Sequence, residues 1–143
     1  MPYRYLEEIA IADVAFEATG RTLEELFVAA ADATTNVMVG DLASIADRER
    51  RSIRAEEEPP DMLLLDLLQE LVYYKDAERL LLRVPEVHIQ RTDGGLTLAA
   101  EAHGEQLDAA KHVLLVDIKA VTMHRFEVTQ TENGWRATVV LDI

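Results

Sequence analysis

Two aspartates near opposite ends of the chain have the residue chemistry best suited to a functional site. Asp13 interrupts an apolar stretch near the N-terminus, and Asp142 is the penultimate residue, next to the α-carboxylate of Ile143. If the first and last strands are neighbours, these three carboxylates converge at one end of a sheet. Like charges gathered in this way are costly unless a cation joins them. Oxygen-only ligands suit a hard cation, so the sequence predicts a divalent metal ion: Ca²⁺, Mg²⁺ or Mn²⁺.

A structural role for the same side chains stays open at this stage. In that interpretation Asp142 pairs with Arg125 across a hairpin, and Asp13 only ends a strand. Other chemistry has little support, because the chain has no cysteine and therefore no disulfide, thiolate nucleophile or cysteine-ligated zinc. It also has no Walker loop, HExxH or GxSxG motif, and its four histidines lie on separate predicted elements.

The element that must position Asp142 is a predicted β-hairpin over residues 117–143. Two runs rich in Val, Thr and aromatic residues flank Asn133-Gly134, a strong signal for a type I′ turn. Counting outward from that turn places Arg125 opposite Asp142 on one face. The same count pairs residues on an apolar face: Val128 with Val139, Phe126 with Leu141, and His124 with Ile143.

Two helices and several more strands are predicted upstream of the hairpin. Thr22 and Glu25 form a capping-box pattern, and the apolar spacing after them predicts a helix over residues 23–38. Residues 62–74 are apolar around most of a helix circumference, which predicts a second, buried helix ending at Lys75-Asp76. The predicted strands cover residues 3–11, 14–18, 48–58, 80–90 and 96–103.

This order of elements indicates an α+β fold. Runs of adjacent strands with few helices are typical of a mixed or antiparallel β-sheet with the two main helices packed on it, closed here by the C-terminal β-hairpin. A length of 143 residues predicts one domain over residues 1–143. No apolar run approaches the length of a membrane span, so the default expectation is a soluble, cytoplasmic protein without a membrane partner.

The charge balance bears on partners. Fourteen basic residues stand against 27 acidic ones, which gives a formal net charge of −13. Such a surface repels phosphate backbones, so we expect no direct high-affinity binding of nucleic acid. It would attract cations or a basic protein partner, although the charge could also serve solubility alone.

Several fragments, in their order along the chain, resemble the motifs of one known family. They are Ala12-Asp13, the helix start from Gly20 to Phe27, the segment Leu67–Tyr73, the group Gly104-Glu105, Asp108 and His112, and the C-terminal signature Lys119–His124 followed by Val-Leu-Asp-Ile. Together they are similar to the archease family, whose members assist the GTP-dependent RNA ligase of tRNA splicing. Ala10 stands where the family carries a histidine, and Ile11 replaces the threonine that follows it.

The resemblance implies a function and further site residues. It implies an accessory protein, not an enzyme, that binds the ligase, promotes guanylylation of the ligase's active-site histidine and thereby allows multiple turnover. Asp13, Asp142 and the Ile143 carboxylate would hold the divalent cation. Lys119 would contact phosphate or, by preference, pair structurally with Asp117 or Glu70. The further site candidates are Lys119, His124 and Glu70.

Two other classes of function remain as alternatives. A stand-alone metal-dependent phosphohydrolase could use the same carboxylates, although the sequence supplies no second metal cluster and no obvious general base. A chaperone-like or purely structural binding module would need no chemistry at all. Turnover of nucleotides by the purified protein alone would separate the first class from the accessory role.

Overall fold

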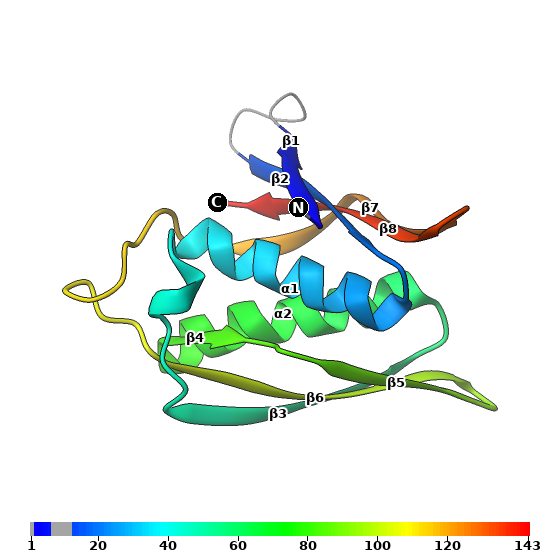
Figure 1. Ribbon diagram of the computed structural model, residues 1–143, viewed down its shortest axis with the longest axis horizontal. Helices are drawn as coiled ribbons and strands as arrows, with labels where there is room; N and C mark the ends of the chain where they lie inside the picture. Colours follow the sequence, from blue (N-terminus) through cyan, green and yellow to red (C-terminus); the bar gives the residue numbers. More distant parts are fainter. Residues whose placement is uncertain (1, 7–12) are drawn as a thin grey trace.

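The computed structural model describes residues 2–6 and 13–143, which form three layers (Figure 1). Two antiparallel sheets lie on opposite sides of a layer of two helices, and both helices contact both sheets. The first sheet has the order β1 (Tyr3–Leu6), β2 (Asp13–Gly20), β8 (Gly134–Asp142) and β7 (Ala120–Thr131). The second contains β3 (Glu49–Glu57), β6 (Gly95–Gln106) and β4 (Leu80–Arg83), with β5 (Val87–Thr92) also paired to β6.

The predicted α+β class is confirmed, and the single predicted sheet becomes two. The segment 80–90 is two strands, since β4 and β5 pair in turn with β6 and Pro85 lies between them. Proline lacks the N–H that a continuous ladder requires. Of the predicted strand over residues 3–11, β1 covers Tyr3–Leu6, and residues 7–12 lie outside the described part of the chain.

The first helix matches its prediction. Helix α1 spans Leu23–Met38, and its N-cap Thr22 accepts a hydrogen bond from the Glu25 N–H at 3.1 Å. The Glu25 carboxylate reaches back to the N–H of Arg21 at 3.3 Å. A short 3₁₀ turn, η1 (Leu42–Ser44), follows α1.

The second helix is longer than predicted. Helix α2 spans Pro60–Glu78 and runs through Lys75-Asp76 to a left-handed C-cap at Arg79 (φ 56°). The charged residues do not end the helix because the Lys75 side chain is buried and bound by partners elsewhere in the fold. Neither helix in the described part of the chain combines the length and apolarity needed to cross a membrane.

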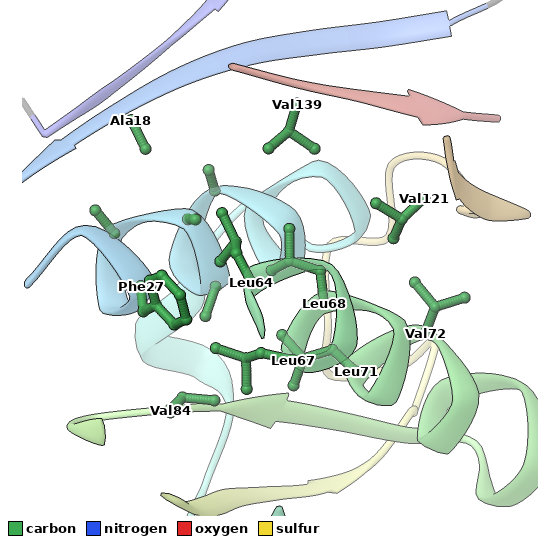
Figure 2. Close-up of a cluster of buried hydrophobic side chains, with 14 of the residues drawn as sticks. Ala18, Phe27, Leu64, Leu67, Leu68, Leu71, Val72, Val84, Val121 and Val139 are labelled. Atoms are coloured by element: carbon green, nitrogen blue, oxygen red, sulfur yellow. The ribbon is translucent and has the colours of Figure 1, made fainter. Parts of the chain in front are cut away.

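The core lies around the helices and joins both sheets. Leucines of α2 point in several directions, toward the first sheet and toward the second, as Figure 2 shows. Ala18 and Val139 come from the first sheet, and Val84 from the segment after β4. A helix enclosed on both sides needs apolar residues around most of its circumference, which explains the Leu-rich sequence of α2.

The predicted register of the C-terminal hairpin is wrong by two residues. Thr131 pairs with Gly134, so Glu132 and Asn133 form the loop, and Val128 lies opposite Ala137 rather than Val139. Neither loop residue takes the positive φ that a type I′ turn requires at both central positions, and Gly134 (φ 152°) follows the loop. From Glu127 to Thr131 this shift of two residues keeps each side chain on its predicted face, since the side-chain period of a strand is two.

Candidate functional site

Asp13 and Asp142 are direct partners across the antiparallel pair β2–β8. Residues opposite each other in such a pair have side chains on one face, with Cβ atoms about 5 Å apart. Phe16 and Val139 alternate with them and face the helices, so both aspartates lie on the outer face of the first sheet. The last strand therefore neighbours the second strand, β2, rather than the first strand as predicted, and the two aspartates still meet because Asp13 begins β2.

Ile143, the third predicted ligand, lies beside this pair. Ile143 directly follows Asp142, and all three residues are partly exposed. Like charges placed directly opposite each other destabilise a sheet. Within residues 2–6 and 13–143, neither aspartate forms a salt bridge that would offset the repulsion.

The donor chemistry of the pair fits a hard divalent cation. Carboxylate oxygens are the ligands that Ca²⁺ and Mg²⁺ prefer. The described residues contain no group of three or more His, Cys, Asp or Glu side chains arranged to hold a metal ion. Two side-chain carboxylates alone would therefore leave the site incomplete, and ligation by the Ile143 carboxylate stays a prediction.

The predicted alternative pairing of Asp142 with Arg125 is wrong. The partner of Asp142 on β7 is Ala120, because the β7–β8 register shifts between Thr122 and Glu127. Arg125 lies inside this bulge, in the left-handed backbone conformation with φ 56°. The hairpin count could not anticipate the shift, since it assumed an uninterrupted ladder.

His124 also lies in the bulge rather than opposite Ile143. Its side chain is exposed, as are those of Met123 and Arg125. The prediction that His124 faces the chain end is therefore corrected. His124 lies on β7, an edge strand of the sheet that carries the aspartates. Bulges change the direction of side chains and are frequent near functional sites.

Lys119 lies at the same sheet end as the carboxylate pair. Its backbone N–H donates to the Asp142 carbonyl oxygen at 2.7 Å, and its side chain is exposed. Among the described residues Lys119 pairs with neither Asp117 nor Glu70, which corrects the preferred structural expectation. Asp117 is bound by Lys75 instead.

Glu70 belongs to a different part of the surface. It lines a shallow pocket of about 330 Å³ between α2 and β3, together with Asp66 and Arg54. Burial, then a hydrogen bond with Glu57, raises the pKa of Asp66 to about 6, and the negative charge of Glu70 adds to this effect. The structure brings Asp13, Asp142, Ile143 and Lys119 together but not Glu70.

Glu105 lies at the centre of a buried ionic network. The sequence predicted no role for this residue. Its carboxylate accepts hydrogen bonds from the Ala46 N–H at 2.9 Å, Lys111 at 2.6 Å and His112 Nε2 at 2.9 Å. The Asp108 N–H donates to His112 Nδ1 at 3.0 Å, which assigns the ring proton to Nε2. The Ala46 N–H, followed by Lys111 and His112, lowers the pKa of Glu105 to about 2.

A second buried charge, Lys75, was also missed. Its ammonium group bonds the carboxylates of Asp76 and Asp117 and the carbonyl oxygen of Ile118, the last at 2.8 Å. Burial alone would lower the pKa of Lys75, but the hydrogen bonds that its ammonium group donates to the two carboxylates outweigh burial and raise the pKa. The signal was present in the sequence, because Lys75 falls four residues after buried Leu71 on the inner face of α2.

Comparison with known proteins identifies the family. The model of the Archease protein family matches residues 3–143. The archease of Methanosarcina barkeri is 37% identical over 142 residues, which cover 99% of this chain and 95% of that protein. The archease of Pyrococcus abyssi is also 37% identical, over 92% of this chain and 93% of that protein. This chain belongs to the archease family.

Solved structures agree with this archease assignment. The solution structure of a Methanobacterium thermoautotrophicum protein superposes with a TM-score of 0.85 at 33% identity and covers 99% of both chains. A crystal structure from Thermotoga maritima, described as an archease and possible chaperone, has a TM-score of 0.57 at 17% identity, over 98% of this chain and all of that chain. The second likeness extends to the fold alone.

Proposed function

We propose that this archease activates the GTP-dependent RNA ligase of tRNA splicing, in the cytoplasm, with a divalent cation held by Asp13, Asp142 and the Ile143 carboxylate. The observation that carries the proposal is the direct pairing of Asp13 with Asp142 beside the chain end. Membership of the archease family supplies the context. The role is to promote guanylylation of the ligase, so that the ligase can complete repeated cycles of tRNA splicing or RNA repair.

The chemistry of the carboxylate end suits a phosphate-handling partner. A bound divalent cation supplies positive charge that can offset developing negative charge on nucleotide phosphates. Asp13 and Asp142 would orient their oxygens toward one point, since both sit on the same face of adjacent strands. The Lys119 N–H holds the Asp142 backbone at 2.7 Å, which fixes the penultimate residue, and the exposed Lys119 side chain is available to a phosphate group.

The overall charge favours a protein partner over RNA. A net charge of −13 opposes association with a phosphate backbone and assists association with a basic protein surface. We therefore propose that the archease reaches RNA only through the ligase. Binding to the ligase should weaken with salt, and the association rate should fall first, because electrostatic steering is screened over about 8 Å at physiological ionic strength.

The test is a multiple-turnover RNA ligation assay with the ligase of the same organism. Wild-type protein should increase the number of turnovers, and Asp13→Ala should remove the increase. Asp93→Ala, which changes an exposed aspartate in the β5–β6 turn, is the matched control and should stimulate like the wild type. Equal turnover with and without the wild-type protein would reject the proposal, and hydrolysis of nucleotides by the protein alone would favour a phosphohydrolase.

A further inference from the structure

Four consecutive aliphatic side chains are exposed in the segment between β6 and β7. Val113, Leu114, Leu115 and Val116 have exposed fractions of 61%, 39%, 55% and 41%. Single exposed apolar residues are ordinary, whereas an exposed run of four is a liability for a soluble protein unless it serves binding. We refer to Val113–Val116 as the strap.

The backbone of the strap is held in place rather than loose. The Gly40 N–H donates to the Val113 carbonyl oxygen at 2.8 Å, and the Leu115 N–H donates to the Met38 carbonyl oxygen at 2.9 Å. Leu114 thereby forms an isolated antiparallel bridge with Val39, just beyond the end of α1. These two hydrogen bonds and the bridge attach the strap to the end of α1.

One edge of the strap is left for a further strand. In an antiparallel bridge of this geometry, the N–H and C=O of the central residue point away from the bridging partner. Leu114 has no backbone hydrogen-bond partner among residues 2–6 and 13–143. A strand edge with apolar side chains is the arrangement that accepts or donates a strand in protein recognition.

Both ends of the strap are anchored by the buried charges described above. His112, immediately before it, is held by Glu105 and by the Asp108 N–H. Asp117 and Ile118, immediately after it, are held by Lys75. Two buried ionic networks therefore flank an exposed apolar segment, and this preorganisation lowers the entropic cost of binding.

The strap lies at the same end of the molecule as the carboxylate pair. Figure 1 shows the segment between β6 and β7 projecting at the end where the C-terminus lies. Lys119, whose N–H bonds the Asp142 carbonyl oxygen, is three residues from Val116, a span of at most about 11 Å. A partner that covers the strap would therefore reach the carboxylates.

We propose that the strap binds in an apolar cleft on a basic protein partner. Resting on the proposed function, this partner is the RNA ligase. Charge complementarity selects the occupant. An exposed carboxylate, that of Asp41, follows Gly40, whose N–H bonds Val113, and the whole chain carries −13. Two copies of such a chain repel each other, whereas a basic surface is attracted. The strap supplies binding, and the carboxylate pair supplies the effect on the ligase.

The test compares binding with stimulation in one set of variants. The strap variant carries Val113→Ser and Leu115→Ser, which change its two most exposed side chains. Tyr73→Gln, which removes a similarly exposed apolar side chain (56%) from α2, is the control. The strap variant should bind the ligase about tenfold more weakly or worse, because buried aliphatic contacts are lost. It should retain its melting temperature, and saturating concentrations should restore full stimulation of ligation.

Hydrogen exchange and the remaining outcomes separate docking at the strap from the proposed function. Hydrogen exchange at the Leu114 amide should slow when the ligase is added to the wild type, as a newly paired strand edge requires. A strap variant that binds as tightly as the wild type, or no more weakly than Tyr73→Gln, overturns the docking proposal and leaves the proposed function standing. A wild-type dimer that the strap substitutions dissociate would show that the occupant is a second copy. Wild-type protein that neither binds nor stimulates the ligase overturns both proposals.

Discussion

Asp13 of β2 and Asp142 of β8 stand directly opposite each other on the outer face of the first sheet. No salt bridge within the described residues neutralises either carboxylate. Without a cation, repulsion between the two carboxylates therefore destabilises the fold. Removing one of the two charges should stabilise the protein without metal and weaken its stabilisation by metal.

The effect of Asp142→Asn on the melting temperature should depend on whether a divalent metal ion is present. Without divalent ions the substitution should raise the melting temperature slightly, since it removes the repulsion with Asp13. With saturating Ca²⁺ or Mn²⁺ the wild type should gain about 5–10 °C, because an ion bound only to the folded state at 100 times its Kd contributes about 2.7 kcal/mol. Asp142→Asn should lose most of that gain. Thermal unfolding with and without metal checks this, and an identical metal response in both proteins would exclude the site.

A C-terminal tag should weaken the same site. Extending the chain beyond Ile143 replaces the α-carboxylate by a neutral amide carbonyl, a weaker ligand for a hard cation. We expect metal affinity to fall about tenfold or more in isothermal titration, with the melting temperature in chelator unchanged. The same tag at the N-terminus is the control. Equal affinity for both tagged proteins would show that the terminus is not a ligand.

Glu105→Gln should destabilise the protein in a pH-dependent manner. The pKa of Glu105 in the folded protein is lowered to about 2, below the ordinary value of 4.5. Its ionised form therefore stabilises the fold above pH 4.5, and this contribution is lost as pH falls toward 2. At pH 7 the variant should melt on the order of 5 °C lower than the wild type, and the difference should shrink steadily below pH 4.5.

The exposed Glu86, whose one ion pair among the described residues is with His88, provides the control for that experiment. Glu86→Gln should match the wild type throughout the titration. A difference between wild type and Glu105→Gln that stays constant from pH 7 to pH 2 would mean that the network with His112 and Lys111 does not depend on the charge of Glu105.

Substitution by alanine should have different effects at two glycines, one at each hairpin turn. Gly134 has φ 152°, and a methyl group there would collide with the carbonyl oxygen of Gly20, so Gly134→Ala should cost about 2 kcal/mol or more. Gly94, in the β5–β6 turn, has open space around it, and Gly94→Ala should stay within about 0.5 kcal/mol of the wild type. Denaturant unfolding of both variants measures their free energies of unfolding. Equal values would contradict the position of Gly134 against Gly20.

Local sequence signals predicted the elements that local interactions determine. The Thr22–Glu25 capping box and the apolar spacing after it located α1 at Leu23–Met38 without error. Period-two alternation correctly placed Asp142 on the face opposite Val139 and Leu141, because that face depends on spacing within β8 and not on the register with β7. Ligation of a metal by these residues stays a prediction.

Features that depend on distant partners could not be predicted. Lys75 was taken as the end of α2, but Asp117, 42 residues later, neutralises it and lets the helix continue. The bulge around Arg125, in the edge strand β7, carries no local turn signal, so the predicted pairing of Asp142 with Arg125 was wrong. Residues Ala10 and Ile11, which differ from the family pattern, lie outside the described residues.

Guanylylation of the ligase is the step on which the carboxylate pair should act. Transfer of labelled GMP to the ligase should be followed in single-turnover conditions with saturating wild-type protein or Asp142→Asn, after binding of both to the ligase has been measured. We predict equal binding, accelerated GMP transfer with the wild type, and the unassisted rate with Asp142→Asn. Acceleration by Asp142→Asn equal to that of the wild type would contradict the claim that the carboxylate pair acts on the ligase.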